Sequence, residues 1–244
     1  MDTTPHTPAE KKKIDLSQVR NGILFLTFDD GRFETWLPQL KLFERFNAKA
    51  TFFYDKEITP EAAESMKELR RAGHSVGLHT TTHKDAVDIA PEEYFAQYIL
   101  PQIRQAEKYG VKDISHFAYP NNRHSAEFDT FLSSYFKRFR AGTGIKAPKG
   151  FWIADFDEPY IPLEKLSSQK VLGGCGIGPF YESTSENLDA ALEKAAAANL
   201  AITFFSHAIL PEAKGVHMSE EMAEKILEKA TSLGMVIAGF DELP

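Results

Sequence analysis

The chain has 244 residues, 43% of them hydrophobic, which is enough to bury the full core of one enzyme domain. The formal net charge is −7, and no basic stripe is present, which argues against nucleic acid or another anionic polymer as a substrate but not against a neutral glycan. The sequence contains no run of 18 apolar residues, so we expect no membrane span.

Short apolar runs alternate with amphipathic stretches along the chain. The strand candidates are residues 23–28, 49–54, 74–78, 115–119, 138–141, 171–175, 201–206 and 235–238. Between most of them, apolar residues recur at spacings of three and four, which is typical of one helix face: Trp36, Leu40 and Phe43; Ala62, Met66 and Leu69; Leu188, Leu192 and Ala195; Met222, Ile226, Ala230 and Leu233. This alternation predicts a parallel sheet, open or closed.

The chain divides into a short arm and one long domain. Residues 1–18 are polar and include a run of lysines at 11–13, which is typical of a solvated arm, and residues 19–244 are predicted to form a single domain. No apolar signal segment follows the N-terminus, so either the protein is cytoplasmic or a signal peptide has been removed. The glycine-rich segment 173–178 lacks the Lys-Ser/Thr end of a phosphate loop and is expected to be a flexible loop.

Polar residues cluster at the ends of two predicted strands. Thr27-Phe28-Asp29-Asp30-Gly31 closes the first strand, and Gly31 ends it with a turn. His79-Thr80-Thr81-Thr82-His83 follows the strand at 74–78, and two histidines at i and i+4 can share one face of a helical turn. Taken alone, each segment could be only a turn or a pair of structural histidines. Together, one Asp and two His can hold a divalent ion and leave a position open for water, as in catalytic sites.

These segments resemble the first motifs of a known enzyme family. With Ala50-Thr51-Phe52-Phe53, they are similar to the polysaccharide deacetylase family, also called carbohydrate esterase family 4 or the NodB homology domain. Phe117-Ala118-Tyr119-Pro120-Asn121-Asn122 stands where the third motif belongs, and Ile202-Thr203-Phe204-Phe205-Ser206-His207 resembles the late strand that ends in the catalytic His. The resemblance covers residues 23–240 and implies an irregular (β/α)7 barrel. Polar residues at the ends of four strands also favour a barrel over an open sheet.

The resemblance implies a metal-dependent hydrolase that removes N-acetyl groups from peptidoglycan, chitin-like polymers or poly-N-acetylglucosamine. It implies one divalent metal, Zn²⁺ in the first instance with Co²⁺, Ni²⁺ or Mn²⁺ as alternatives, held by Asp30, His79 and His83. The expected partner is the acetylated glycan, with no nucleic acid and no membrane span. If a signal peptide has been removed, the family resemblance favours a periplasmic, cell-envelope or secreted location.

Amide hydrolysis also needs a proton acceptor, a proton donor and a stabilised oxyanion. The resemblance assigns the first role to Asp29 and the second to His207. It places the oxyanion at the backbone N–H of Asn121, which follows Pro120, and we expect Tyr119 to lie near the substrate.

The third motif departs from the family pattern. Members usually begin it with an Arg that orients the catalytic carboxylate, and that position is Ala118 here. Arg123 or Arg32 could substitute for it. Of the aromatic residues, Tyr119, Phe180 and Tyr181 could stack on sugar rings or belong to the core.

The fourth motif has only a loose counterpart, Phe151-Trp152-Ile153-Ala154-Asp155-Phe156-Asp157. We expect Trp152 to lie in the core rather than in a wall of the site. Asp155 or Asp157 could support the imidazolium of His207, or could be surface acids.

Two alternatives to glycan N-deacetylation stay open. One is deacylation of another substrate, either an acetyl-xylan ester or a small cyclic amide. The other is a glycan-binding pseudoenzyme, for which the missing Arg is the best argument. The intact set of polar residues argues against it, because drift is expected to erase residues that do nothing for folding.

Overall fold

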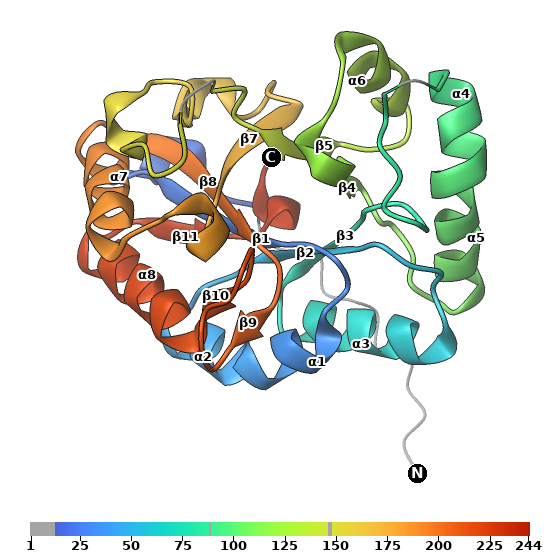
Figure 1. Ribbon diagram of the computed structural model, residues 1–244, viewed down its shortest axis with the longest axis horizontal. Coiled ribbons are helices and arrows are strands. Elements are labelled where there is room, and N and C mark those ends of the chain that lie inside the picture. The colour runs from blue at the N-terminus through green and yellow to red at the C-terminus, as the bar shows by residue number, and fades with distance from the viewer. Residues whose placement is uncertain (1–12, 88, 146–147) are drawn as a thin grey trace.

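A closed barrel of parallel strands with helices outside it forms the molecule (Figure 1). The computed structural model describes residues 13–87, 89–145 and 148–244. In this part of the chain, seven strands follow one another around the barrel: β1 (Ile23–Phe28), β2 (Thr51–Tyr54), β3 (Ser75–Leu78), β4 (His116–Ala118), β5 (Arg138–Gly142), β7 (Val171–Gly176) and β8 (Leu200–Ser206). Because β1 pairs with both β2 and β8, the sheet closes. The predicted irregular (β/α)7 barrel is confirmed.

Additional strands make the barrel irregular. Strand β11 (Val236–Ala238) pairs in parallel with the first half of β1, while β2 pairs with Thr27 and Phe28 in its second half. Strand β6 (Tyr160–Pro162) adds to β8 in antiparallel orientation. The two-residue strands β9 (Ile209–Leu210) and β10 (Met218–Ser219) pair with each other after β8. They extend the chain beyond the carboxyl end of β8, where the predicted site residues lie.

Helices connect most of the strands and cover the barrel. In the described ranges they are α1 (Phe33–Trp36), α2 (Leu40–Arg45), α3 (Pro60–Arg71), α4 (Pro91–Tyr94), α5 (Leu100–Lys108), α6 (Ala126–Leu132), α7 (Ser185–Ala197) and α8 (Glu220–Ser232). The expected cap of α3 is present, since the Thr59 side chain accepts a hydrogen bond from Ala62 N–H and Pro60 is the first helical residue. A π-helical turn, Phe95–Ile99, joins α4 to α5.

The eight predicted strands all form, with ends that differ by at most two residues. The sequence did not predict β6, β9 and β10, because two or three residues carry too little periodicity to be recognised. The expectation of a flexible loop at 173–178 is wrong for its first part, since β7 extends to Gly176. A Cβ added at Gly176 would lie 2.5 Å from the Tyr181 ring, and one at Gly174 would lie 3.0 Å from the Phe205 ring. These glycines therefore make room for neighbouring rings.

The described part of the N-terminal arm lies against the end of the chain. Ile14 N–H donates to Glu242 O, the Lys13 ammonium donates to Leu243 O, and Leu16 packs against a core cluster. Residues 1–12 lie outside the described residues, and the domain boundary at residue 18 stays a prediction. No helix among the described residues is both long and apolar enough to cross a bilayer.

Candidate metal centre and active site

Three side chains converge at the carboxyl end of the barrel. Asp30 lies two residues beyond the end of β1, and His79 and His83 come from the loop after β3, two strands further around the barrel. One ligand atom from each residue lies within 4.8 Å of the others. The Nε2 atoms of both histidines are 3.7 Å from Asp30 Oδ1. This spacing leaves room for one ion between the three ligand atoms.

The loop that carries the histidines is not the helical turn that their spacing suggested. Thr80 and His83 have φ angles of 70° and 54°, and Asp30 has 72°, so the backbone at this site is left-handed. A left-handed β-branched residue such as Thr80 is strained and needs support from its surroundings. The buried Gln102 amide gives that support, because its Nε2 donates to Thr80 O at 2.9 Å and to Tyr54 O at 3.0 Å. It ties the ends of β2 and β3 together.

The protonation states suit a metal ligand set. His79 Nδ1 lies 2.8 Å from Ala118 O, so this nitrogen donates its proton and Nε2 keeps its lone pair toward Asp30. Burial, reinforced by the nearby Arg140 cation, lowers the pKa of His79 well below its ordinary value and keeps the ring neutral. Asp30 Oδ1 is buried and has no hydrogen-bond partner among the described residues. An unpartnered carboxylate oxygen facing two imidazole nitrogens fits a divalent ion such as Zn²⁺.

Asp29 lies beside this cluster in a buried ion pair. Its backbone N–H donates to Ser206 O, which continues the pairing of β1 with β8 and turns its side chain away from that of Asp30. The guanidinium of Arg140, on β5, donates to Asp29 Oδ2. Both side chains are at most 3% exposed, and Asp29 Oδ1 has no partner in the described part of the chain. Arg140 therefore fixes one carboxylate oxygen and leaves the other available.

Arg140 orients the Asp29 carboxylate, a role for which Arg123 and Arg32 were the candidates. Both of those expectations are wrong. Arg123 instead pairs with Asp85 at 2.9 Å and is 56% exposed. Arg32 lies 4.0 Å from Asp30, not beside Asp29. Long side chains in flexible positions cannot be placed from sequence, whereas a charged residue on a buried strand must find a partner.

The loop after β4 is held from two sides. Arg140 also donates to the Asn122 side chain, and Asp85 accepts a hydrogen bond from Asn121 Nδ2 at 2.6 Å. Asn121 and Asn122 have φ angles of 52° and 60°, which asparagine tolerates better than most residues. None of the hydrogen bonds found among the described residues uses the Asn121 backbone N–H. This N–H is free to meet a developing negative charge.

His207 stands on the other side of Asp30. Its Nε2 is 3.8 Å from Asp30 Oδ2, and its Nδ1 is 3.2 Å from Val216 O. Of the two alternatives for Asp155 and Asp157, the structure favours surface acids, since both residues are exposed and Asp157 pairs with Lys194. A backbone carbonyl, not a carboxylate, lies next to His207 Nδ1. That carbonyl belongs to the segment between β9 and β10, which no sequence motif marked.

Several aromatic expectations are also revised. Tyr119 and Pro120 are buried, and the Tyr119 hydroxyl donates to Asp129, so Tyr119 supports the loop rather than contacting substrate. Trp152 was expected in the core but is 48% exposed. The Tyr181 ring packs edge-to-face against Phe205, and burial raises the pKa of its hydroxyl to about 12.

Sequence reasoning missed three residues of the site: Arg140, Asp85 and His217. His217 accepts a hydrogen bond from Ala208 N–H, and its ring centroid is 5.9 Å from that of His207. Arg140 could have been suspected, because a charged residue on a predicted buried strand needs a partner, and the structure places it in register with Ala118. Asp85 and His217 lie in irregular segments with no such signal.

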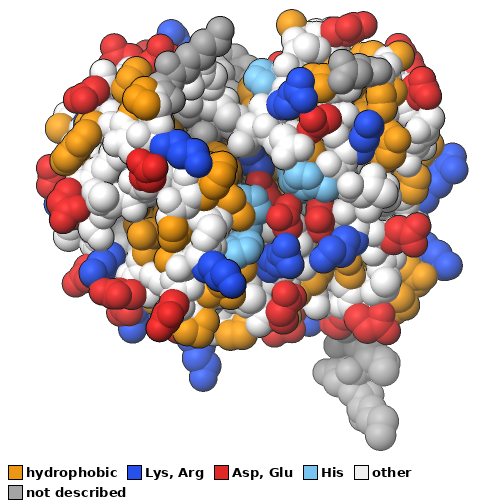
Figure 2. Space-filling model, viewed as in Figure 1, with side chains coloured by type: hydrophobic (Ala, Val, Ile, Leu, Met, Phe, Trp, Pro, Cys, Tyr) orange, Lys and Arg blue, Asp and Glu red, His pale blue; other side chains and the backbone are white. Residues whose placement is uncertain are grey.

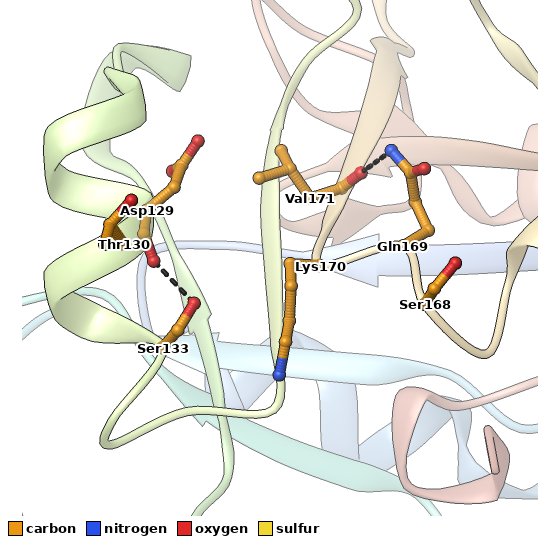
Figure 3. A pocket seen from close by; sticks show the side chains of 7 residues that line it. All are labelled: Asp129, Thr130, Ser133, Ser168, Gln169, Lys170 and Val171. Atoms are coloured by element: carbon orange, nitrogen blue, oxygen red, sulfur yellow. Dashed lines mark hydrogen bonds between the residues drawn. The ribbon is translucent and has the colours of Figure 1, made fainter.

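The space-filling view shows a central hollow in this face of the molecule (Figure 2). Histidine and acidic side chains gather on its floor, with basic side chains at its rim and hydrophobic ones along its left side (Figure 2). A separate open cavity of about 350 Å³ lies beside α6 and the start of β7 (Figure 3). It is lined by Asp129, Thr130, Ser133, Ser168, Gln169, Lys170 and Val171. None of the three candidate metal ligands lines it, so we place the chemistry in the hollow.

A closed parallel barrel with an Asp-His-His cluster at the carboxyl ends of its strands is typical of metal-dependent hydrolases. Comparison with known proteins shows which metal-dependent hydrolases this chain is similar to. The family model for polysaccharide deacetylases matches residues 17–135. Residues 17–135 of this chain are therefore similar to the polysaccharide deacetylase family.

Curated relatives match only in part. Over 98 residues the chain is 35% identical to a peptidoglycan-N-acetylglucosamine deacetylase of Bacillus cereus, covering 39% of this chain and 36% of the relative. Over 68 residues it is 37% identical to a chitin deacetylase of Arthroderma benhamiae, covering 27% of this chain and 18% of the relative. The chain thus spans about a third or less of the length of these relatives.

Solved structures share the fold over most of the chain. A family 4 acetyl xylan esterase from Clostridium thermocellum, in complex with a cobalt ion, has a TM-score of 0.59 at 19% identity and covers 91% of this chain and 93% of its own. A family 4 pseudoenzyme from Bacillus anthracis has a TM-score of 0.55 at 14% identity and covers 97% of this chain and 66% of its own. At these identities the likeness concerns the fold alone.

Proposed function

We propose that this chain is a metal-dependent deacetylase that releases acetate from the N-acetyl groups of an N-acetylglucosamine-containing glycan. The buried Asp29–Arg140 pair carries the proposal, because it holds a carboxyl group directly before Asp30 in the chain and fixes it with a guanidinium. Burying an ion pair costs desolvation free energy, and glycan binding alone gives no reason for that cost. An enzyme gains an oriented proton acceptor.

Asp30, His79 and His83 would hold one divalent ion, with Zn²⁺ favoured by the mixed imidazole and carboxylate ligands. Such an ion lowers the pKa of a bound water and polarises a carbonyl oxygen. Neutral His79 and the unpartnered Asp30 Oδ1 support the assignment, because both offer lone pairs without first losing a proton or a protein partner.

The remaining roles follow from position. Asp29 accepts a proton from the attacking water through its free Oδ1, while Arg140 holds Oδ2 in place. The Asn121 N–H stabilises the negative charge on the acetyl oxygen in the transition state. His207, with Nδ1 oriented by Val216 O, donates a proton through Nε2 to the departing amine nitrogen.

One acetate-release assay distinguishes the proposed deacetylase from an esterase and from a glycan-binding pseudoenzyme. Metal-stripped protein is assayed for acetate release from chitin oligomers, acetylated peptidoglycan, poly-N-acetylglucosamine and acetyl xylan, without metal and with Zn²⁺ or Co²⁺. We expect release from an N-acetylated glycan only when metal is added. Release from acetyl xylan alone would favour an esterase. Binding of a glycan with no acetate release under any metal would favour a pseudoenzyme and overturn the proposal.

A further inference from the structure

Two exposed aromatic side chains lie on loops at the barrel mouth. Phe180 is 50% exposed and Trp152 is 48% exposed, and Tyr135, just after α6, is the third large hydrophobic residue so exposed among the described ones. Exposing a large apolar side chain forgoes the free energy of burying it. A single such residue needs no explanation, but a ring that continues the wall of a catalytic site indicates a ligand.

Phe180 is connected to the site by a row of aromatic rings. The ring centroids of His207 and Phe205 are 6.3 Å apart, those of Phe205 and Tyr181 are 5.4 Å apart, and those of Tyr181 and Phe180 are 5.2 Å apart. Phe205 is buried and Phe180 is exposed, so the row leads from His207 out to solvent. The hydrophobic side chains that border the histidines in the central hollow agree with this arrangement (Figure 2).

The Phe180 ring is held in place without a ligand. The Lys149 ammonium lies 3.6 Å from its centroid and covers one face, and Phe180 N–H donates to Gly215 O at 2.7 Å. Gly150 N–H donates to Tyr181 O, which joins the loop that carries Trp152 to the loop that carries Phe180. A ring ordered in advance loses little conformational entropy when it binds.

We propose that Phe180 forms a sugar-binding subsite that stacks on the hexosamine unit next to the one being deacetylated. This inference rests on the proposed function and extends it, because it requires a glycan of at least two units. A pyranose ring has an apolar face of C–H groups and an edge of hydroxyls. The free part of the Phe180 ring suits the face, and the Lys149 ammonium can donate hydrogen bonds to the edge.

The experiment compares Phe180→Ala with wild type on chitin oligomers from two to five units, as substrates of the Zn²⁺-loaded enzyme and as ligands in calorimetry. We expect KM for the pentamer and its dissociation constant to rise by roughly 2- to 10-fold, in the range of one lost aromatic contact, while kcat stays close to wild type. Phe180→Tyr should keep wild-type values. Tyr135→Ala is the matched control, since it removes an equally exposed ring far along the chain from the two loops.

Equal pentamer binding by Phe180→Ala and wild type would overturn the subsite while leaving the deacetylase proposal intact. An equal loss in Tyr135→Ala would also overturn it, because the effect would not be local. If wild type releases no acetate from any glycan, the proposed function fails, and calorimetry still decides the subsite: weaker pentamer binding by Phe180→Ala supports it, and unchanged or absent binding rejects it.

Discussion

Arg140 on β5 is the direct register partner of Ala118 on β4, and its guanidinium reaches Asp29 at the end of β1. The resemblance places the orienting arginine at the position of Ala118. In this chain the Arg140 guanidinium comes from the neighbouring strand β5, at the position in register with Ala118. The Phe205 ring packs against the Arg140 guanidinium, with the guanidinium carbon 4.7 Å from the ring centroid. The missing arginine of the third motif is therefore no argument for a pseudoenzyme.

Arg140→Gln is expected to lower kcat by roughly 10²-fold, because Asp29 loses the group that fixes its orientation. It should also lower the free energy of unfolding by about 3–5 kcal/mol, since a buried carboxylate is left without its partner. Steady-state kinetics and urea denaturation measure the two effects. Arg123→Gln is the control and should keep wild-type kcat, because Arg123 contacts Asp85 instead. Similar losses in both variants would contradict the role assigned to Arg140.

Asp29→Asn and His207→Ala should separate proton transfer from metal binding. Each is expected to lower kcat by roughly 10²–10⁴-fold while metal content stays at wild-type level, because neither side chain belongs to the ligand set. Kinetics together with elemental analysis checks this. Adding Arg140→Gln to Asp29→Asn should cost little further activity if Arg140 acts through Asp29. Retained turnover in Asp29→Asn would mean that no carboxylate base is needed.

His83→Ala should remove both the bound metal and the activity while the protein stays folded, since the His83 side chain is 34% exposed and can be truncated without a large core cavity. Elemental analysis of the purified variant measures the loss. His124→Ala is a matched control: His124 is 32% exposed and pairs with Asp129 outside the ligand set. Metal retained by His83→Ala would exclude this site.

The sequence predicted the barrel well because most strands are short runs rich in apolar residues that alternate with amphipathic stretches. The sequence also predicted that Asp30, His79 and His83 lie close together, because the carboxyl ends of parallel strands share one rim of the barrel. The sequence did not predict the contacts that orient the site residues, because these contacts join segments far apart in the chain. Ala118 O orients His79, Val216 O orients His207 and Asp85 holds the Asn121 loop, and all three contacts depend on backbone paths that no local pattern encodes.

Asp85→Ala tests whether the loop after β4 must be held for catalysis. Asp85 accepts hydrogen bonds from Asn121 and Arg123, so its loss should displace the Asn121 N–H and lower kcat by about tenfold, less than the ~10²–10³ for losing an oxyanion donor outright. KM and metal content should change little. Asp85→Asn keeps an acceptor oxygen and should recover most of the activity. A metal loss equal to that of His83→Ala would show that Asp85 serves the histidine loop instead.

His217 should make the stability of the protein depend on pH. Burial lowers its pKa below the ordinary 6.5, the His207, Arg32 and Lys214 charges act in the same direction, and Asp30 opposes them. Its Nδ1 also accepts the Ala208 N–H, which requires an unprotonated nitrogen. Below about pH 6.5 the unfolded chain therefore binds a proton that the folded chain does not, and stability falls as the pH drops from there toward the folded pKa.

Urea denaturation of metal-free protein between pH 7.5 and 5 measures this dependence. His217→Asn is the informative variant, because its amide oxygen can accept the Ala208 N–H but does not titrate in this range. We expect the free energy of unfolding to fall less steeply with decreasing pH in His217→Asn than in wild type, with similar stability at pH 7.5. His124→Asn, in which an exposed histidine bonded to Asp129 is replaced, controls for the loss of any histidine. Parallel curves for wild type and His217→Asn would show that His217 is not the titrating group.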